Sequence, residues 1–168
     1  MRSDIKIREL GKNDREAYFG LLLLALEEAP ESFLMSTKEA KQQIMQTFQD
    51  SLTSDDKSNL IFGAFLHDAL LGTLGLLKKN KDKASSSAII RGVYTQPKYR
   101  GIGIAKTLLE TAIHHAKEHM KCHVISLSVE SASRAAQKLY ESYGFKIERT
   151  EVKEPTYEIS HMFLPLRD

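Results

Sequence analysis

The sequence predicts an α/β (α+β) protein with a mixed, twisted and mostly antiparallel sheet that carries helices on both faces. Its 168 residues give strand-like and helix-like segments in the order β-α-α-β-β-β-α-β-α-β-β. A helix that starts near Ile104 stands between two apolar strand segments, and such a crossover makes its two strands parallel neighbours. The other strands follow one another through short connections, which predicts antiparallel pairs. The length predicts a single domain over residues 1–168.

The N-terminal part predicts one strand and two helices. Residues 4–9 alternate isoleucines with charged residues, as a half-buried strand does. A capping residue followed three positions later by glutamate predicts a helix start at Asn13 and again at Ser36. We expect these helices to end near Glu28, just before a proline, and near Asp50.

The middle of the chain predicts a hairpin and then the strand–helix–strand crossover. Two apolar runs, 60–66 and 70–77, are separated by three residues and predict the hairpin. A strand over 88–95 precedes the helix from Ile104, whose apolar residues fall on one stripe. Alternation over 123–129 predicts the strand that follows.

The last third predicts one more helix and two strands. The helix covers about 132–143 and ends at Gly144, a favoured residue after a helix C-terminus. Residues 145–150 and 157–164 predict the closing strands.

The most informative segment joins the strand 88–95 to the following helix. It reads Arg100-Gly101-Ile102-Gly103-Ile104-Ala105. A glycine-rich turn at a helix start leaves backbone N–H groups unpaired, and with the helix dipole they form an anion site, usually for phosphate. The dinucleotide fingerprint would need glycine at 106, and a P-loop would need glycine at 100 and 105, so both are disfavoured. Taken alone, these six residues leave open a turn without any ligand.

Residues 100–105 follow the pattern R-x-x-G-x-A. They resemble the pyrophosphate loop, Q/R-x-x-G-x-G/A, of the GNAT superfamily of acyl-CoA-dependent N-acetyltransferases. Residues 133–145 resemble the other GNAT signature, N-x-x-A-x-x-L-Y-E-x-x-G-F, and depart from it at Ser133, where the family most often has asparagine. The matching positions are Ala136, Leu139, Tyr140, Glu141, Gly144 and Phe145. The resemblance covers roughly residues 60–164, and more loosely the N-terminal part as well.

The resemblance implies that the two parallel central strands splay apart and that acetyl-CoA enters the gap as cosubstrate, with no metal. Amides of residues 100–106 would bind the pyrophosphate, with added charge from Arg100 and Lys106. The strand edge near Val93 and Thr95 would pair with the pantetheine arm and polarise the thioester carbonyl. The predicted cofactor-binding residues are Val93, Thr95, Arg100, Gly101, Ile102, Gly103, Ile104, Ala105, Lys106, Ser133 and Tyr140.

The resemblance also assigns Tyr140 as the general acid that protonates the departing thiolate. An amine of pKa ~10.4 is protonated at neutral pH, so a proton acceptor is needed as well. Glu130 is predicted for this role, with Glu27, Glu28 and Glu31 as alternatives. We expect direct attack by a primary amine in a ternary complex, because the single cysteine falls on a strand core and no Ser-His-Asp arrangement stands out.

The acceptor is predicted to be a cationic amine, such as a polyamine, an aminoglycoside-like compound or a lysine side chain. We expect residues 27–36 and 151–156 to line the site where the acceptor binds. These two segments carry an acidic rim made of Glu27, Glu28, Glu31, Glu151 and Glu154. An acceptor of this charge would be attracted to that rim.

The bulk properties limit the other classes of function. A net charge of +2 is too small to indicate nucleic-acid or membrane binding, and the longest apolar run, 19–26, is too short to span a bilayer. One cysteine and no visible signal peptide predict a cytoplasmic protein. The histidines near 114–123 are expected on a solvated helix surface rather than on a metal. The alternative function is a non-catalytic acyl-CoA sensor or subunit with a GNAT fold. A nucleotide-hydrolysing enzyme is less favoured than either. The resemblance also allows a homodimer.

Overall fold

The computed structural model describes residues 4–28, 57–79, 86–153 and 157–167, together with Lys38, Glu39, Gln42, Gln43, Met45, Gln46 and Gln49. These last residues are helical, as the sequence predicts, and the rest of the predicted second helix lies outside the described residues. The elements in chain order are β1 (Ile5–Glu9), the 3-10 turn η2 (Lys12–Asp14), α1 (Arg15–Glu28), β2 (Asn59–Leu66), β3 (Ala69–Lys78), β4 (Ser87–Thr95), the 3-10 turn η4 (Pro97–Tyr99), α3 (Ile104–Glu118), β5 (Val124–Glu130), α4 (Arg134–Ser142), β6 (Lys146–Lys153) and β7 (Tyr157–Pro165).

The predicted start of the first helix is wrong in detail. The capping contact is made by Asp14, whose Oδ2 accepts the N–H of Gly11 at 2.7 Å. The same carboxylate holds the Arg8 guanidinium through two bonds of 2.8 and 2.9 Å. A 3-10 turn from Lys12 therefore precedes α1, because the carboxylate that reaches back is at 14 rather than 16.

The seven strands form one sheet in the order β1-β2-β3-β4-β5-β7-β6. Only β4 and β5 run parallel, and every other neighbouring pair is antiparallel. The mixed, mostly antiparallel sheet is therefore confirmed. β6 is an edge strand and runs three residues beyond its predicted end, because pairing with β7 extends through a charged segment that carries no apolar alternation.

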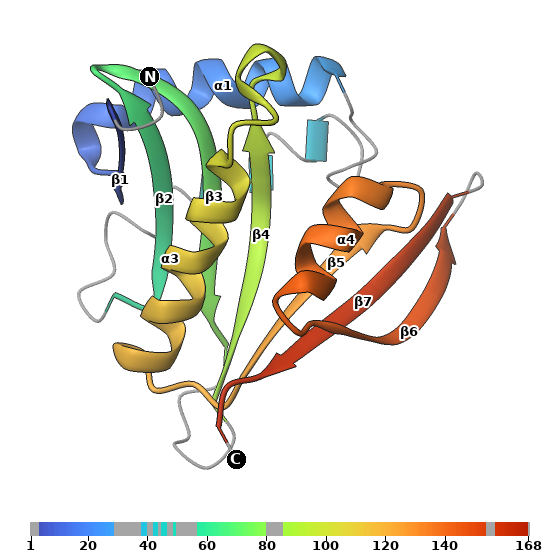
Figure 1. The fold of residues 1–168 in the computed structure, drawn as a ribbon. Helices are drawn as coiled ribbons and strands as arrows, with labels where there is room; N and C mark the ends of the chain where they lie inside the picture. Colours follow the sequence, from blue (N-terminus) through green and yellow to red (C-terminus); the bar gives the residue numbers. More distant parts are fainter. Residues whose placement is uncertain are drawn as a thin grey trace.

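The parallel pair separates after a short contact. β4 and β5 pair only at Ser87↔Val124, Ala88↔Ile125 and Ile89↔Ser126, and beyond these residues the two strands diverge in Figure 1. β4 then has one residue more than β3, because Arg91 lies opposite Gly75 and Tyr94 lies opposite Thr73. Such a bulge bends and twists a strand, and Gly92 within it adopts a φ of +63°. The splay that the resemblance implies is confirmed.

Helices cover both faces of the sheet, as predicted. α3 and α4 lie over one face in Figure 1 and contribute Leu108 and Tyr140 to the main core cluster. α1 contributes Leu21 to a second cluster. Successive residues of β2 belong to different clusters, Ile61 to the one with α1 and Phe62 to the one with α3, which is the two-sided burial of a central strand. Among the described helices, none is both long and apolar enough to cross a membrane.

Candidate active site

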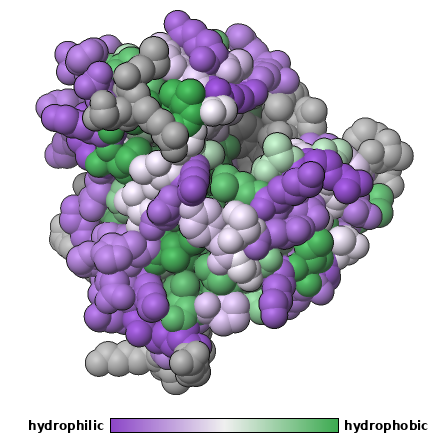
Figure 2. Space-filling view, in the orientation of Figure 1, coloured by the Kyte–Doolittle hydropathy of each residue, from purple (hydrophilic) through white to green (hydrophobic). Residues whose placement is uncertain are grey.

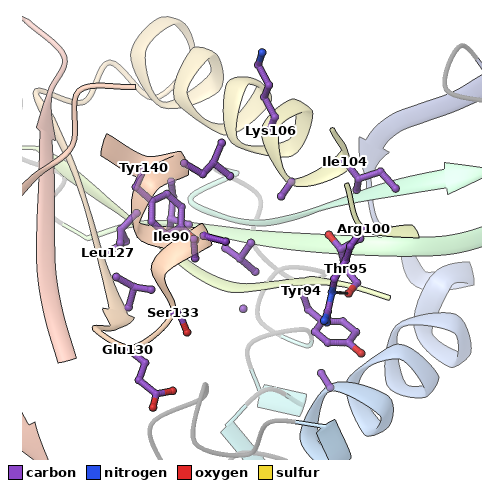
Figure 3. Close-up of a pocket in the computed structure, with 18 of the residues that line it drawn as sticks. Ile90, Tyr94, Thr95, Arg100, Ile104, Lys106, Leu127, Glu130, Ser133 and Tyr140 are labelled. Carbon is purple, nitrogen blue, oxygen red and sulfur yellow. Dashed lines mark hydrogen bonds between the residues drawn. The ribbon is translucent and has the colours of Figure 1, made fainter. Parts of the chain in front are cut away.

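A cavity of about 890 Å³ opens where β4 and β5 separate. Its walls are β4 over 90–95, the loop and first turn of α3, β5 over 127–130, and α4 with Tyr140. Figure 3 shows Tyr140, Leu127 and Ile90 grouped at one end and Arg100, Thr95 and Tyr94 at the other. Figure 2 shows hydrophobic surface in the middle of this face, between more hydrophilic groups on either side. The volume lies within the range of small-molecule and cofactor sites.

The glycine-rich loop presents unpaired backbone donors to this cavity. Gly101 and Gly103 have φ angles of +82° and +90°, a conformation that favours glycine. Gly103 caps α3, and the Thr107 N–H is the first to close a helical bond, to Gly103 O at 3.0 Å. Amides from 101 to 106 have no acceptor among the described residues. The N-terminus of α3 is thus suited to an anionic group, as the sequence predicts.

The Arg100 side chain points away from these amides. Its guanidinium donates two hydrogen bonds to the Glu28 carboxylate, at 2.9 and 2.7 Å, and its Nε donates to Thr95 O at 2.8 Å. Bidentate pairing with a carboxylate is a strong use of this side chain, so the guanidinium joins the end of α1 to β4. The Arg100 N–H also has an acceptor, Pro97 O at 3.3 Å, so in this arrangement neither the side chain nor the amide of Arg100 is available to a phosphate.

The Arg100–Glu28 pair alters the titration of its surroundings. The hydrogen bonds from Arg100 hold the pKa of the Glu28 carboxyl below its ordinary value. The pKa of Tyr94 is raised, first by burial and then by its hydrogen bond to Glu28. The Arg100 guanidinium also lies 5.4 Å from the centre of the Tyr94 ring. Glu28 and Tyr94 both line the cavity, so this cluster closes one end of it.

Tyr140 occupies the opposite end of the cavity. Only 6% of the residue is exposed, and burial raises the pKa of its hydroxyl to about 12. The ring packs edge-on against Phe145, with centroids 5.9 Å apart. No described side chain forms a hydrogen bond with the Tyr140 hydroxyl. A neutral phenol at this position has the proton that a general acid must give.

Four other predicted residues line the same cavity. Thr95 Oγ1 is buried without a hydrogen-bond partner among the described residues, and Val93 lies in the β4 bulge. Ser133 caps α4 without a side-chain hydrogen bond to the helix. Glu130 ends β5 and has no ion-pair partner in the described part of the chain.

Of the remaining predicted site residues, some line the cavity and others do not. Ala105 and Lys106 line the cavity, whereas Ile102 packs against the main core and does not. Glu27 is exposed and lies outside the cavity lining. Glu31 falls outside the described residues.

The structure reveals a serine–histidine–glutamate contact that the sequence did not indicate. Ser128, on the cavity wall, lies 2.8 Å from His161 Nδ1, and His161 Nε2 lies 3.0 Å from Glu151. The contact differs from the Ser-His-Asp pattern considered in the sequence, because a glutamate stands in the place of the aspartate. Only the pairing of β5 with β7 brings Ser128 opposite His161, and no local sequence pattern reports that register.

Histidine rings contact one another at the C-terminal end of α3. The rings of His115 and His119 are tilted by 36° with centroids 4.9 Å apart, and burial lowers the pKa of His115. Within the described ranges no three histidine, cysteine or acidic side chains are placed to hold a metal ion.

The sheet is split around a cavity, and amides at the start of the following helix have no acceptor among the described residues. This is the arrangement that the two sequence motifs imply for an acetyltransferase. The model of the acetyltransferase (GNAT) family matches residues 21–145, and the chain belongs to that family. No curated protein sequence matches the chain significantly.

Solved structures share the fold at low sequence identity. A spermidine N-acetyltransferase from Vibrio cholerae, in complex with CoA and spermine, superposes with a TM-score of 0.77 at 21% identity, covering 98% of this chain and 96% of that one. The protein yncA from Salmonella typhimurium, with acetyl-CoA, gives 0.77 at 18% identity over 98% and 95%. The ribosomal-protein-S18-alanine N-acetyltransferase from Escherichia coli gives 0.72 at 18% over 98% and 95%.

Proposed function

We propose that the protein transfers the acetyl group of acetyl-CoA to a primary amine, by direct attack of the amine in a ternary complex. The observation that carries this proposal is the row of amides at the start of α3 that have no acceptor among the described residues, in a segment that lines the cavity between β4 and β5. Structural neighbours with CoA or acetyl-CoA support the same cosubstrate. Acetyl-CoA supplies a thioester, whose carbonyl carbon an amine attacks.

Each wall of the cavity has a role in this proposal. The amides of 101–106 hold the pyrophosphate, and the β4 edge around Val93 and Thr95 pairs with the pantetheine arm. Thr95 Oγ1, buried and without a described partner, has hydrogen-bonding capacity to offer an entering polar group. Ser133 stands at the same wall, and Tyr140 gives a proton to the departing thiolate.

The acceptor is proposed to be a cationic amine. Of the predicted acidic rim, Glu28 is held by Arg100 and Glu151 by Lys153 at 3.1 Å. Glu130 lies on the cavity wall and has no ion-pair partner in the described part of the chain, so its carboxylate attracts the cationic amine. A polyamine and a protein amine are both represented among the neighbours, by the spermidine and S18-alanine enzymes.

Calorimetric titration with acetyl-CoA, CoA and ATP tests the cofactor site. We expect the wild type to bind both CoA species and the Gly103→Glu variant to bind neither, because a carboxylate in the loop repels an anion and a side chain is strained at positive φ. Lys117→Gln, exposed on the same helix, makes the same change in net charge and should bind normally. Binding of ATP without CoA would overturn the proposal.

An acceptor screen separates an enzyme from a sensor. Acetyl transfer to polyamines, aminoglycosides or lysine peptides, followed by release of free thiol, supports an enzyme. Tight CoA binding without transfer to any amine would instead favour the non-catalytic acyl-CoA module. Reaction with neutral or anionic amines alone would contradict the proposed cationic acceptor.

A further inference from the structure

Three polar side chains from three adjacent strands form a continuous hydrogen-bonded chain that begins at the cavity. Ser128 Oγ on β5 lies 2.8 Å from His161 Nδ1 on β7. His161 Nε2 lies 3.0 Å from Glu151 Oε1 on β6. The His161 side chain is 21% exposed and that of Glu151 is 37% exposed. Ser128 is exposed at the cavity wall, so the chain links that wall to the two outer strands β7 and β6.

Glu151 determines the direction in which these hydrogen bonds point. Hydrogen bonds from His161 and then from Lys153 lower the pKa of the Glu151 carboxyl, so it is ionised at neutral pH and only accepts. His161 therefore donates its Nε2 hydrogen to Glu151, which leaves Nδ1 as the acceptor for the Ser128 hydroxyl. A hydroxyl held in this way can pass its proton to the imidazole as it receives another.

The chain lies on the face of the sheet opposite Tyr140. Leu127 and Met162 are directly paired, and both belong to the core cluster that contains Tyr140. Ser128 and His161 form the next pair along, and successive side chains of a strand point to opposite faces. Tyr140 and Ser128 thus approach the cavity from opposite sides, which suits a thiolate that leaves on one side and an amine that arrives on the other.

We propose that Ser128, His161 and Glu151 form a proton relay that deprotonates the acceptor amine. This inference rests on the proposed acetyl transfer and assigns the proton acceptor within it. Ser128 contacts the amine and is the catalytic residue, whereas His161 and Glu151 act through it as positioning residues. Glu130, two residues further along the same face of β5, holds the positive charge of the amine.

The step balances in protons and bonds. The ammonium nitrogen gives one proton to Ser128 Oγ as Ser128 passes its own to His161 Nδ1, and the imidazolium beside Glu151 then releases a proton to solvent. The neutral nitrogen bonds to the thioester carbonyl carbon, the C–S bond breaks, and Tyr140 protonates the thiolate. The second nitrogen proton leaves to solvent and Tyr140 is reprotonated from solvent, so each turnover of a cationic amine releases one proton.

Acceptors of different basicity test the relay. The probes are spermidine, or a better cationic amine from the acceptor screen, and hydrazine at slightly alkaline pH, where it is largely neutral. We expect His161→Gln and Ser128→Ala to lower kcat/KM about 10- to 100-fold with the basic amine and less than about threefold with hydrazine. KM for acetyl-CoA should not change. The double variant should be no worse than either single variant, because both remove one relay.

The pH profile separates the relay from Glu130. Among the described residues, the charged groups on this face near His161 are Glu130 from β5 and Lys146, Arg149, Glu151 and Lys153 from β6. His161→Gln should abolish the break that the relay contributes to the acid side of the kcat/KM profile. Glu130→Gln should keep that break and raise KM for the cationic amine. The relay would be overturned if Glu130→Gln abolished the acid-side break and His161→Gln kept it, or if kcat/KM fell equally with both amines. An acetyl group found on Ser128 by mass spectrometry would also overturn it.

A measurement without any acceptor makes the two proposals distinguishable. Nitrogen NMR of the imidazole should show His161 protonated at Nε2 and unprotonated at Nδ1 at neutral pH. Protonation at Nδ1 alone would overturn the relay even in an active enzyme. Failure of the wild type to bind CoA or to acetylate any amine would overturn the proposed function itself, whereas unchanged kinetics in His161→Gln would overturn only the relay.

Discussion

Tyr140 and Arg100 are both side chains whose surroundings decide what they can do. Tyr140 is buried with its proton retained, because burial raises its pKa to about 12. Arg100 has its positive charge matched by Glu28 and its Nε used by a backbone carbonyl of β4. Tyr140 can therefore donate a proton, whereas the Arg100 side chain is already bound to other parts of the protein before a ligand binds.

Tyr140→Phe should lower kcat about 10- to 100-fold, towards the low end of what a general acid contributes, because a thiol of pKa ~8.5 is a fair leaving group. Since the hydroxyl stays neutral below a pKa of about 12, no alkaline loss of kcat from Tyr140 is expected near neutral pH. Steady-state kinetics across pH measure both effects. Tyr143→Phe, at the C-cap of the same helix and outside the cavity lining, should keep kcat. A fully active Tyr140→Phe would remove the acid role.

Glu28→Gln should lower the free energy of unfolding by about 0.2–1 kcal/mol at pH 7, since the pair with Arg100 is partly exposed. The pKa of Glu28 is lowered from 4.5 in the folded chain, so its contribution is present above that value and is lost as pH falls through the folded pKa. Urea unfolding at neutral and strongly acidic pH measures the difference. Glu27→Gln is the exposed control, and an equal loss at acidic pH would contradict this account.

At the scale of elements, close approach of β3, β4 and the start of α3 fixes the cavity wall. A Cβ on Gly72 of β3 would lie 2.8 Å from Tyr94 O and 3.3 Å from Ile104 Cγ2. The backbone oxygen of Tyr94 cannot move aside as easily as the end of a flexible side chain can, so the overlap is costly. The absence of a side chain at 72 therefore lets the strand before the loop and the helix after it pack on β3.

Gly72→Ala should destabilise the protein by about 1–3 kcal/mol through this overlap. Gly20→Ala is the matched control, because a Cβ there meets nothing within 4 Å and alanine in a helix is favoured over glycine by about 0.5–1 kcal/mol. Urea midpoints of the two variants should move in opposite directions. A Gly72→Ala variant as stable as the wild type would show that β4 can shift at little cost.

At the scale of the molecule, two half-sheets meet at only three residue pairs of β4 and β5. The part of each strand beyond that contact has main-chain groups turned towards the gap. An open pair of this kind leaves donors and acceptors to be satisfied by solvent or by a ligand.

Binding of CoA should therefore protect amides of 90–95 and 101–106 against hydrogen exchange, while amides shared by β2 and β3 change little. It should also raise the melting temperature with ligand concentration, as any ligand of the folded state does. Exchange measured with and without CoA tests this. Stabilisation without protection in these two segments would place the ligand elsewhere.

The sequence predicted the elements well and their partners only in part. The apolar runs 60–66 and 70–77 and the glycine loop carry local signals, and both were found with the expected form. Contacts between distant segments carry no local signal. Arg100 meets Glu28 across 72 positions, and His161 meets Ser128 because β7 inserts between β5 and β6. Pairing order and side-chain partners are set by the three-dimensional packing, which periodicity does not report.

The divergence of β4 and β5 also bears on how such proteins can vary. A slot walled by peptide groups places few demands on side-chain identity, since every residue except proline offers the same N–H and C=O. Most positions around it can then drift, provided that the strands still part and the turn before α3 keeps its glycines. The Vibrio cholerae enzyme has the same backbone fold, with a TM-score of 0.77, at only 21% identity. Divergence of this degree is expected where the site depends on backbone groups and few side chains are constrained.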